Sequence, residues 1–290
     1  MMIQFAGMIR RPLPFARLLA ISGMLAIAVP TMLTVARVHW TSQEGTQGPI
    51  ILATTAWLLW RLRTVLSSES APPVGMAWVM ALVPLVLVHA FSRIYSILPI
   101  ETASTYLIGL VAATAYFGLS IVRRFWFPFL YPAFLIVPPV SFAAELTLPL
   151  KLWISAKCVG MLHALGYPVA LSGATIQIGQ YELLVRQACA GLGSLVTLCA
   201  VGLFYVHLRR EADLRSSVVL LVAIVPVAIA ANAVRVAMLV LLTWYFGNGV
   251  GQGVAHEAAG LLMFCVAMAL MFGISSALDA LASDRDPRNG

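Results

Sequence analysis

The chain has 290 residues, of which 61% are hydrophobic and only 10% are charged, and its net charge is +7. This is too little charge to cover the surface of a water-soluble domain of this length. The arginines lie in short clusters between apolar runs, a pattern that sets membrane orientation and argues against nucleic-acid binding. The composition therefore predicts an all-α polytopic membrane protein.

The N-terminal half contains five apolar runs separated by arginines and turn residues. The second run is short, and the fifth carries four prolines, which bend a helix. The basic start and the first run lack a clear cleavage site of small residues, so we expect a retained helix and not a removed signal peptide. The expected spans lie at about 16–36, 49–60, 74–91, 103–122 and 127–144.

Residues 145–188 interrupt the series of spans and form an expected insertion outside the membrane. The first part, residues 145–166, predicts a small amphipathic helix that lies at the membrane surface. Residues 174–185 alternate between apolar and polar around Gly179-Gln180, which predicts a β-hairpin. The candidate apolar face of the amphipathic helix consists of Leu150, Trp153, Ile154, Met161 and Leu162.

Three further runs, at about 189–207, 216–246 and 255–276, bring the expected number of transmembrane helices to about eight. The run at 216–246 is longer than one span needs, so it either projects past the bilayer or breaks near Ala231-Asn232. With a cytoplasmic N-terminus, 12 of the basic residues face inward and 6 face outward, which satisfies the positive-inside rule. We expect a single integral membrane domain over 1–290, with N-terminal spans in 1–124, a later part at 125–276 and a cytoplasmic tail at 277–290.

Cys189 lies where the polar insertion ends and the sixth apolar run begins. Free backbone N–H groups and the dipole at a helix N-terminus favour the thiolate, which is the nucleophilic form of cysteine. Arg186 adds positive charge nearby, and Gly191 leaves room for the backbone of a substrate. These features indicate a catalytic nucleophile. The alternative is a small buried hydrophobic side chain, as most cysteines in membrane helices are.

Arg235 is flanked by apolar residues on both sides within the seventh run. A charge inside a membrane span is costly, so it is a functional hypothesis by default. Asn232 lies three residues earlier on the same helical face, where it is placed to orient the guanidinium. The alternative is an arginine near the interface whose side chain reaches the lipid headgroups.

His256 opens the eighth run, and imidazole is the natural base for a thiol at neutral pH. The alternative is a capping or interfacial histidine. In the expected topology Cys189, Arg235 and His256 fall on the outer side at one membrane depth. Together they compose an acyl-transfer site in which Cys189 attacks a carbonyl, His256 transfers protons, and Arg235 stabilises the oxyanion or holds a substrate carboxylate.

Three segments of the chain resemble the exosortase/archaeosortase family of membrane-embedded sorting enzymes, and the resemblance covers about residues 125–276. They are Ala188-Cys189-Ala190-Gly191-Leu192, Asn232-x-x-Arg235 and His256-x-x-x-Gly260. By position, the resemblance implies that Cys189 is the nucleophile, Arg235 the electrostatic partner and His256 the acid/base. The family often has serine after the cysteine, where this chain has Ala190, so an accessory hydroxyl contact is missing.

The resemblance also implies an activity and a location. It implies a cysteine protease or transpeptidase of the bacterial cytoplasmic (inner) membrane, with its active site on the extracytoplasmic side. The implied substrates are exported proteins with a C-terminal sorting signal of the PEP-CTERM type, which comprises a short motif such as Pro-Glu-Pro, one transmembrane helix and a basic cluster. Cleavage near the motif would pass the protein to an envelope acceptor, often alongside exopolysaccharide production.

The sequence predicts no cofactor and no metal, since the four cysteines form no Cys-x-x-Cys pair. The expected partners are the sorting signal and the lipid bilayer; nucleic acid is not expected, and the sequence does not identify the envelope acceptor. Two other functions are consistent with the same residues. One is a transporter or polysaccharide-export component that uses Arg235 as an anion site and His256 as a proton relay. The other is a noncatalytic assembly scaffold.

Overall fold

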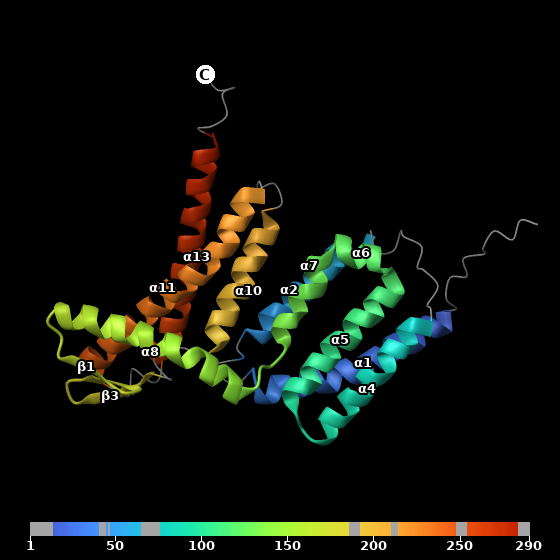
Figure 1. The fold of residues 1–290 in the computed structure, drawn as a ribbon, viewed down its shortest axis with the longest axis horizontal. Coiled ribbons are helices and arrows are strands. Elements are labelled where there is room, and N and C mark those ends of the chain that lie inside the picture. The colour runs from blue at the N-terminus through green and yellow to red at the C-terminus, as the bar shows by residue number, and fades with distance from the viewer. Residues whose placement is uncertain are drawn as a thin grey trace, which may run out of the picture. The chain divides into compact units, whose positions relative to one another are not determined.

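The computed structural model describes residues 14–40, 45, 47–64, 76–185, 192–209, 214–247 and 254–283. Contacts divide the chain into two compact units, Met1–Pro139 and Val140–Gly290. The described residues are mostly helical (Figure 1), and the protein is a multi-pass membrane protein. Five helical segments are long and apolar enough to cross a bilayer, so the expected number of about eight stays a prediction. The five are Leu18–Val38, Met76–Ile94, Leu98–Phe117, Arg215–Phe246 and Ala258–Leu281.

The first unit is built around a pair of consecutive helices, α4 and α5, which pack against each other. α1 packs on α5, and α2 packs on the short 3-10 helix η1. The helices with described bounds in this unit are α1 (Pro14–Val38), α2 (Gly48–Arg61), α4 (Met76–Ile94), α5 (Leu98–Phe117), α6 (Leu119–Arg124), α7 (Trp126–Leu130) and η1 (Tyr131–Leu135).

The expected fifth span, residues 127–144, is not one continuous helix. It consists of α7, η1 and a non-helical stretch, and a new helix begins at Val140. Pro138 and Pro139 account for the break, because proline has no backbone N–H to donate and disfavours a helical conformation in the residue before it. The prolines that were expected to bend this span therefore end it.

A buried carboxylate connects three helices of the first unit. Glu101 on α5 is only 3% exposed. Its Oε1 accepts hydrogen bonds from Nη1 of Arg93 on α4 at 2.6 Å and from Oγ1 of Thr31 on α1 at 2.8 Å. A carboxylate is stable inside a membrane bundle only when it is paired and hydrogen-bonded in this way.

The described part of the second unit contains four long helices and one small sheet. α11 is an unbroken helix of 33 residues, so the chain does not break near Ala231-Asn232. It packs against α10 on one side and α13 on another (Figure 1). The elements are α8 (Val140–Ala164), β1 (Val169–Ser172), β2 (Thr175–Ile178), β3 (Tyr181–Leu184), α10 (Leu192–Leu208), α11 (Leu214–Phe246) and α13 (Val254–Ser283).

One end of this bundle is held by Arg209, which directly follows α10. Its guanidinium donates to Oγ of Ser275 and, through Nη2, to both carboxylate oxygens of Asp279 at 2.6 and 2.7 Å. Both acceptors lie near the C-terminal end of α13. This ion pair marks the end of the bundle opposite the start of α10.

The insertion contains a three-stranded antiparallel sheet in the order β1-β2-β3. β2 and β3 form a hairpin in which Ile178 pairs with Tyr181 across Gly179-Gln180, at the turn that the sequence pattern predicts. β1 was not expected from the sequence. One face of the sheet is buried against α8 and α11. The residues at the centre of this core are Ile176, Ile178 and Leu183 from the sheet, Val185 directly after β3, and Ile154, Leu162, Val236 and Val240 from the helices.

The five residues expected to form the apolar face of the amphipathic helix divide between two environments on α8. Ile154 and Leu162 are buried beneath the sheet, whereas Trp153 and Met161 are 54% and 53% exposed. Leu150 is partly buried against the same core. The sheet covers one side of the helix, so these residues do not form a single surface face.

Replacing Glu101 with alanine removes the acceptor that joins α1, α4 and α5. We expect the free energy of unfolding to fall by about 1 to 2 kcal/mol, because the buried Thr31 hydroxyl loses its carboxylate partner and the Arg93 guanidinium loses its counter-ion. The measurement is the thermal midpoint of the purified protein in detergent. The control is Ile100→Ala, at a side chain that is 42% exposed, and it should shift the midpoint far less. Equal shifts for the two variants would contradict the role given to Glu101.

Candidate functional site

The close packing of α10 against α11 fixes which parts of the two helices lie side by side. A Cβ at Gly202 would lie only 2.8 Å from Cγ1 of Ile224, so the helices touch at this point. The helices run antiparallel, because a short connection joins them and they pack against each other. Ten residues from this contact, about 15 Å along each axis, α10 begins at Leu192 and α11 reaches Val234. The start of α10 therefore lies at the level of residues 234–235 of α11.

Counting residues along the helix axes from a known contact also gives the level at which α13 begins. Val227 of α11 and Ala267 of α13 line one small cavity, and these two helices are also consecutive and packed together. Eight residues further along, α11 reaches Arg235 and α13 reaches Ala259. The backbone of His256 lies three residues beyond Ala259, which is about one helical turn or 5 Å. The three backbone segments that carry or precede the predicted catalytic residues thus lie within about one turn of the same level along the helices.

Three of the predicted site residues, Arg186, Cys189 and Gly191, lie outside the described residues. Helix α10 begins at Leu192, three positions after Cys189. His256 is the third residue of α13, and the structure describes its backbone only. The roles of the cysteine and the histidine therefore stay predictions.

Arg235 and Asn232 are described fully, and both are buried inside the protein. Arg235 is 4% exposed and Asn232 is 2% exposed. A guanidinium that reached the lipid headgroups would be exposed at the protein surface, so this burial argues against the interfacial alternative. Oδ1 of Asn232 accepts no hydrogen bond from the described part of the chain. A buried amide oxygen in this state costs free energy unless some other donor reaches it.

A buried polar face of α8 packs toward the same part of α11. Lys151, Ser155 and Cys158 are 6%, 0% and 4% exposed and are spaced i, i+4 and i+7, so they share one side of the helix. Sγ of Cys158 donates a hydrogen bond to the carbonyl oxygen of Ala233 at 3.4 Å, between Asn232 and Arg235 in the sequence. Sequence reasoning missed Lys151 and Ser155. Their four-residue spacing in an otherwise apolar stretch was the available signal.

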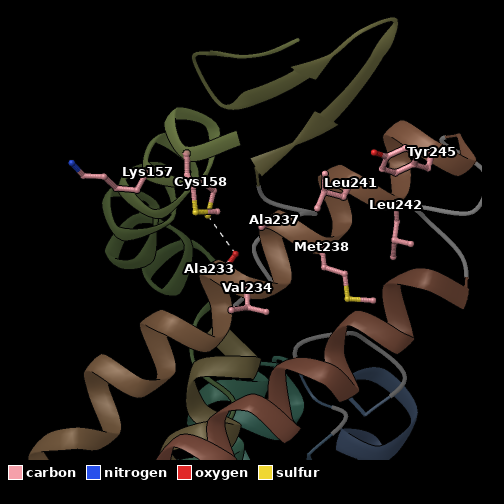
Figure 2. A pocket seen from close by; sticks show the side chains of 10 residues that line it. Lys157, Cys158, Ala233, Val234, Ala237, Met238, Leu241, Leu242 and Tyr245 are labelled. Carbon is pink, nitrogen blue, oxygen red and sulfur yellow. Dashed lines mark hydrogen bonds between the residues drawn. The ribbon is translucent and has the colours of Figure 1, made fainter. Parts of the chain in front are cut away.

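An apolar groove of about 530 Å³ runs along the contact between α8 and α11. Figure 2 shows its side chains: the Cys158 sulfur points at Ala233, while the Lys157 ammonium points away. Along α11 the groove continues from Ala233 to Tyr245. Apart from Lys157 and the Tyr245 hydroxyl, the side chains that line it are hydrophobic, and they include Met161, Val234, Met238 and Leu241.

Tyr245, which lines this groove, is hydrogen-bonded to a second tyrosine. The hydroxyls of Tyr167, which precedes β1, and Tyr245, near the end of α11, lie 3.1 Å apart. The hydrogen bond to Tyr245 raises the pKa of the Tyr167 phenol, with desolvation and Coulombic repulsion from Tyr245 adding to the effect. A pKa raised by folding means that this contact contributes stability below the ordinary pKa of tyrosine and loses it as the pH rises through the raised pKa.

A comparison with known protein families decides the class of the protein. The family described as transmembrane exosortase matches residues 39–273. The chain belongs to the transmembrane exosortase family. No curated protein and no solved structure matches it in the corresponding comparisons.

Membership has direct consequences for this exosortase. Exosortases are transmembrane cysteine peptidases or transpeptidases, and membership indicates a role in processing the sorting signals of exported proteins.

Within the described ranges of this exosortase, no group of three or more histidine, cysteine, aspartate or glutamate side chains is arranged to hold a metal ion.

Replacing Tyr245 with phenylalanine removes the partner of the Tyr167 hydroxyl in this exosortase. We expect the pKa of Tyr167 to fall toward its ordinary value, because the hydrogen bond is the largest cause of the shift. The measurement is a pH titration by NMR of the protein labelled with isotope-enriched tyrosine, with Tyr167→Phe used to assign the resonance. An unchanged Tyr167 pKa in Tyr245→Phe would contradict the assignment of the hydrogen bond.

Proposed function

We propose that this exosortase cleaves the C-terminal sorting signal of exported proteins at the outer face of the bacterial inner membrane. The proposed signal is of the PEP-CTERM type, and the proposed product is passed to an envelope acceptor linked to exopolysaccharide production. Family membership over residues 39–273 supports this proposal. The observation that carries it furthest is the buried Arg235 of α11, which lies at the level where α10 begins just after Cys189.

The proposed chemistry is acyl transfer through a thioester. The thiolate of Cys189 attacks the scissile carbonyl, and a bond forms between sulfur and carbon. Arg235 stabilises the negative charge that develops on the carbonyl oxygen. His256 gives a proton to the departing amine as the carbon–nitrogen bond breaks, and it then takes a proton from the water or acceptor amine that resolves the thioester.

The environment of Arg235 suits this role. An oxyanion stabiliser is most effective in a site that excludes water, because electrostatic interactions are stronger in a low dielectric. A guanidinium that is 4% exposed meets this condition. Asn232, Arg186 and Gly191 support the site in the proposal: Asn232 orients the guanidinium, Arg186 adds positive charge, and Gly191 leaves space for the substrate backbone.

The groove between α8 and α11 is suited to bind the apolar helix of the proposed sorting signal. Its hydrophobic lining extends along α11 from Ala233, two residues before Arg235. Side chains of an apolar substrate helix would be compatible with Met161, Met238 and Leu241. If the substrate helix binds in this groove, the peptide motif next to that helix would lie close to the proposed acyl-transfer site.

Replacing Cys189 with alanine should abolish processing of an exported reporter whose C-terminus carries a Pro-Glu-Pro motif, an apolar helix and a basic cluster. The physical reason is the loss of the only atom proposed to attack the carbonyl. The measurement is the fraction of reporter cleaved in cells that express the variant. The control is Cys265→Ala, since Cys265 is an exposed cysteine on α13 outside the proposed site, and it should process the reporter normally.

Full processing by Cys189→Ala would falsify the nucleophile assignment. The transporter alternative makes the opposite prediction, in which a transport activity survives loss of Cys189 but not loss of Arg235. The scaffold alternative predicts that neither residue is needed.

Replacing Arg235 with glutamine should reduce the rate of reporter cleavage by about 100-fold to 1,000-fold, the usual effect of losing one oxyanion donor. The measurement is the initial cleavage rate at matched amounts of membrane-inserted enzyme. Arg215→Gln is the matched control, because Arg215 is an exposed arginine in the first turn of the same helix. A rate for Arg235→Gln within twofold of the Arg215→Gln rate would remove Arg235 from the mechanism.

A further inference from the structure

The outer edge of β3 presents backbone groups that the sheet does not use. In an antiparallel ladder, hydrogen-bonded pairs alternate with pairs whose N–H and C=O point outward. The Val185 N–H donates to the Ala174 carbonyl at 2.8 Å, so that pair is hydrogen-bonded. The next pair, Leu184 with Thr175, is therefore not hydrogen-bonded, and Glu182 with Gln177 is not either. The N–H and C=O of Glu182 and Leu184 point away from β2.

This edge is accessible in the described part of the chain. Glu182 and Leu184 are both exposed, Leu184 by 49%. Among the described residues, no backbone hydrogen bond reaches either of them across the outer edge. Leu183 and Val185, which alternate with them, are buried against α8 and α11 and hold the strand in place. An exposed strand edge on a firmly packed sheet is a template for pairing with an extended peptide.

The direction of β3 leads toward the candidate site. The turn before β3 packs on the end of α11, since a Cβ at Gly179 would lie 2.6 Å from Cζ3 of Trp244. The other end of the strand, at Leu183 and Val185, belongs to the same core as Val236 and Val240. β3 therefore runs back along α11 toward Arg235. Four strand residues span about 13 Å, close to the rise of about 12 Å along α11 from Trp244 to Val236 at about 1.5 Å per residue.

We infer that the extended motif of the sorting signal binds as a fourth strand on the outer edge of β3. This inference rests on the proposed function. The backbone of the motif pairs with the N–H and C=O of Glu182 and with the N–H of Leu184, which aligns the peptide along α11. Its scissile bond is thereby directed toward the level of Arg235 on α11.

The opposite edge of the sheet fits this role less well. The outward-pointing groups of β1 belong to Val169 and Leu171, and the Val169 N–H already donates to the Tyr167 carbonyl at 2.9 Å. β1 also connects to α8 through Tyr167, whereas β3 ends five positions before Cys189 in the sequence. The two edges therefore provide a matched comparison within one sheet.

The first test uses proline, which removes an N–H and blocks an approaching strand. Leu184→Pro removes an outward N–H and leaves the hydrogen bonds to β2 in place. We expect it to reduce cleavage of the Pro-Glu-Pro reporter at least tenfold, whereas Leu184→Ala and the opposite-edge variant Leu171→Pro stay within twofold of the parent protein. Alkylation of Cys189 by a small maleimide reports whether the site itself is intact and should proceed at the parent rate in all three variants.

The second test detects the pairing itself and does not depend on the proline variant. In a Cys189→Ala background, which retains uncleaved reporter, Leu184→Cys is combined with single cysteines at four consecutive positions of the reporter motif. Strand pairing predicts disulfide cross-links at alternate positions only, because side chains of paired strands alternate between the two faces. The same reporters with Cys189→Ala alone give the background. Uniform cross-linking at all four positions, or none above background, would overturn the inference.

The outcomes separate this inference from the function on which it rests. If Cys189→Ala cleaves the reporter fully, the proposed function fails. If Cys189→Ala is inactive, but Leu184→Pro cleaves as well as Leu184→Ala and the cross-links do not alternate, the enzyme stands and the β3 docking mode is wrong. If Leu184→Pro loses cleavage while Cys189 is alkylated at the parent rate, and the cross-links alternate, the results support the proposed function and the β3 docking mode together.

Discussion

A guanidinium buried within a membrane-spanning helix is the constraint around which the second unit is arranged. Arg235 is 4% exposed in a helix of 33 residues whose neighbours in the sequence are apolar. Removing a charge from water costs several kcal/mol unless partners compensate. The protein therefore surrounds this part of α11 with packed elements on several sides, namely α8 and the sheet, α10 and α13. Burial protects the charge from solvent and strengthens its effect on any group that reaches it.

Two buried polar groups of this protein, one in each unit, have different surroundings. In the first unit the Glu101 carboxylate accepts hydrogen bonds from both Arg93 and Thr31, and this pairing explains how the carboxylate is tolerated. In the second unit the buried Oδ1 of Asn232 accepts no hydrogen bond from the described residues. A polar group satisfied by its neighbours serves the fold. Asn232 lies three residues before Arg235 on α11, where a buried acceptor with remaining capacity suits a site that binds a further donor. The function is assigned to the second unit because the predicted residues Cys189, Arg235 and His256 belong to it.

The sheet and the groove together explain how one small site would bind a substrate that has two parts. Under the proposed function, the substrate has an extended motif and an apolar helix. The outer edge of β3 offers backbone hydrogen bonds, which suit any extended peptide. The groove between α8 and α11 offers hydrophobic contacts, which suit a helix. Both surfaces adjoin α11 and extend toward Arg235, so the junction of the two parts of the substrate would lie nearest the proposed chemistry.

The local features of the protein followed from the sequence because they depend on neighbouring residues. Hydropathy predicted a multi-pass helical protein, and the motifs around Cys189, Arg235 and His256 identified the family. Alternation around Gly179-Gln180 predicted the hairpin turn that the structure shows. Of the two alternatives for the long seventh run, the break was wrong, because the Ala231-Asn232 sequence carries no residue that must end a helix.

The features that the sequence did not predict depend on contacts between distant segments. β1 is a strand because β2 lies beside it, and nothing in its four residues required this. Ile154 and Trp153 are both large and apolar, yet the sheet buries one and leaves the other exposed. Sequence by itself determined the class of protein and the identity of the candidate residues, since chemistry and periodicity are properties of the chain. Only the tertiary structure decided that Arg235 is buried at the level of the start of α10, because burial and depth arise from how helices pack against one another.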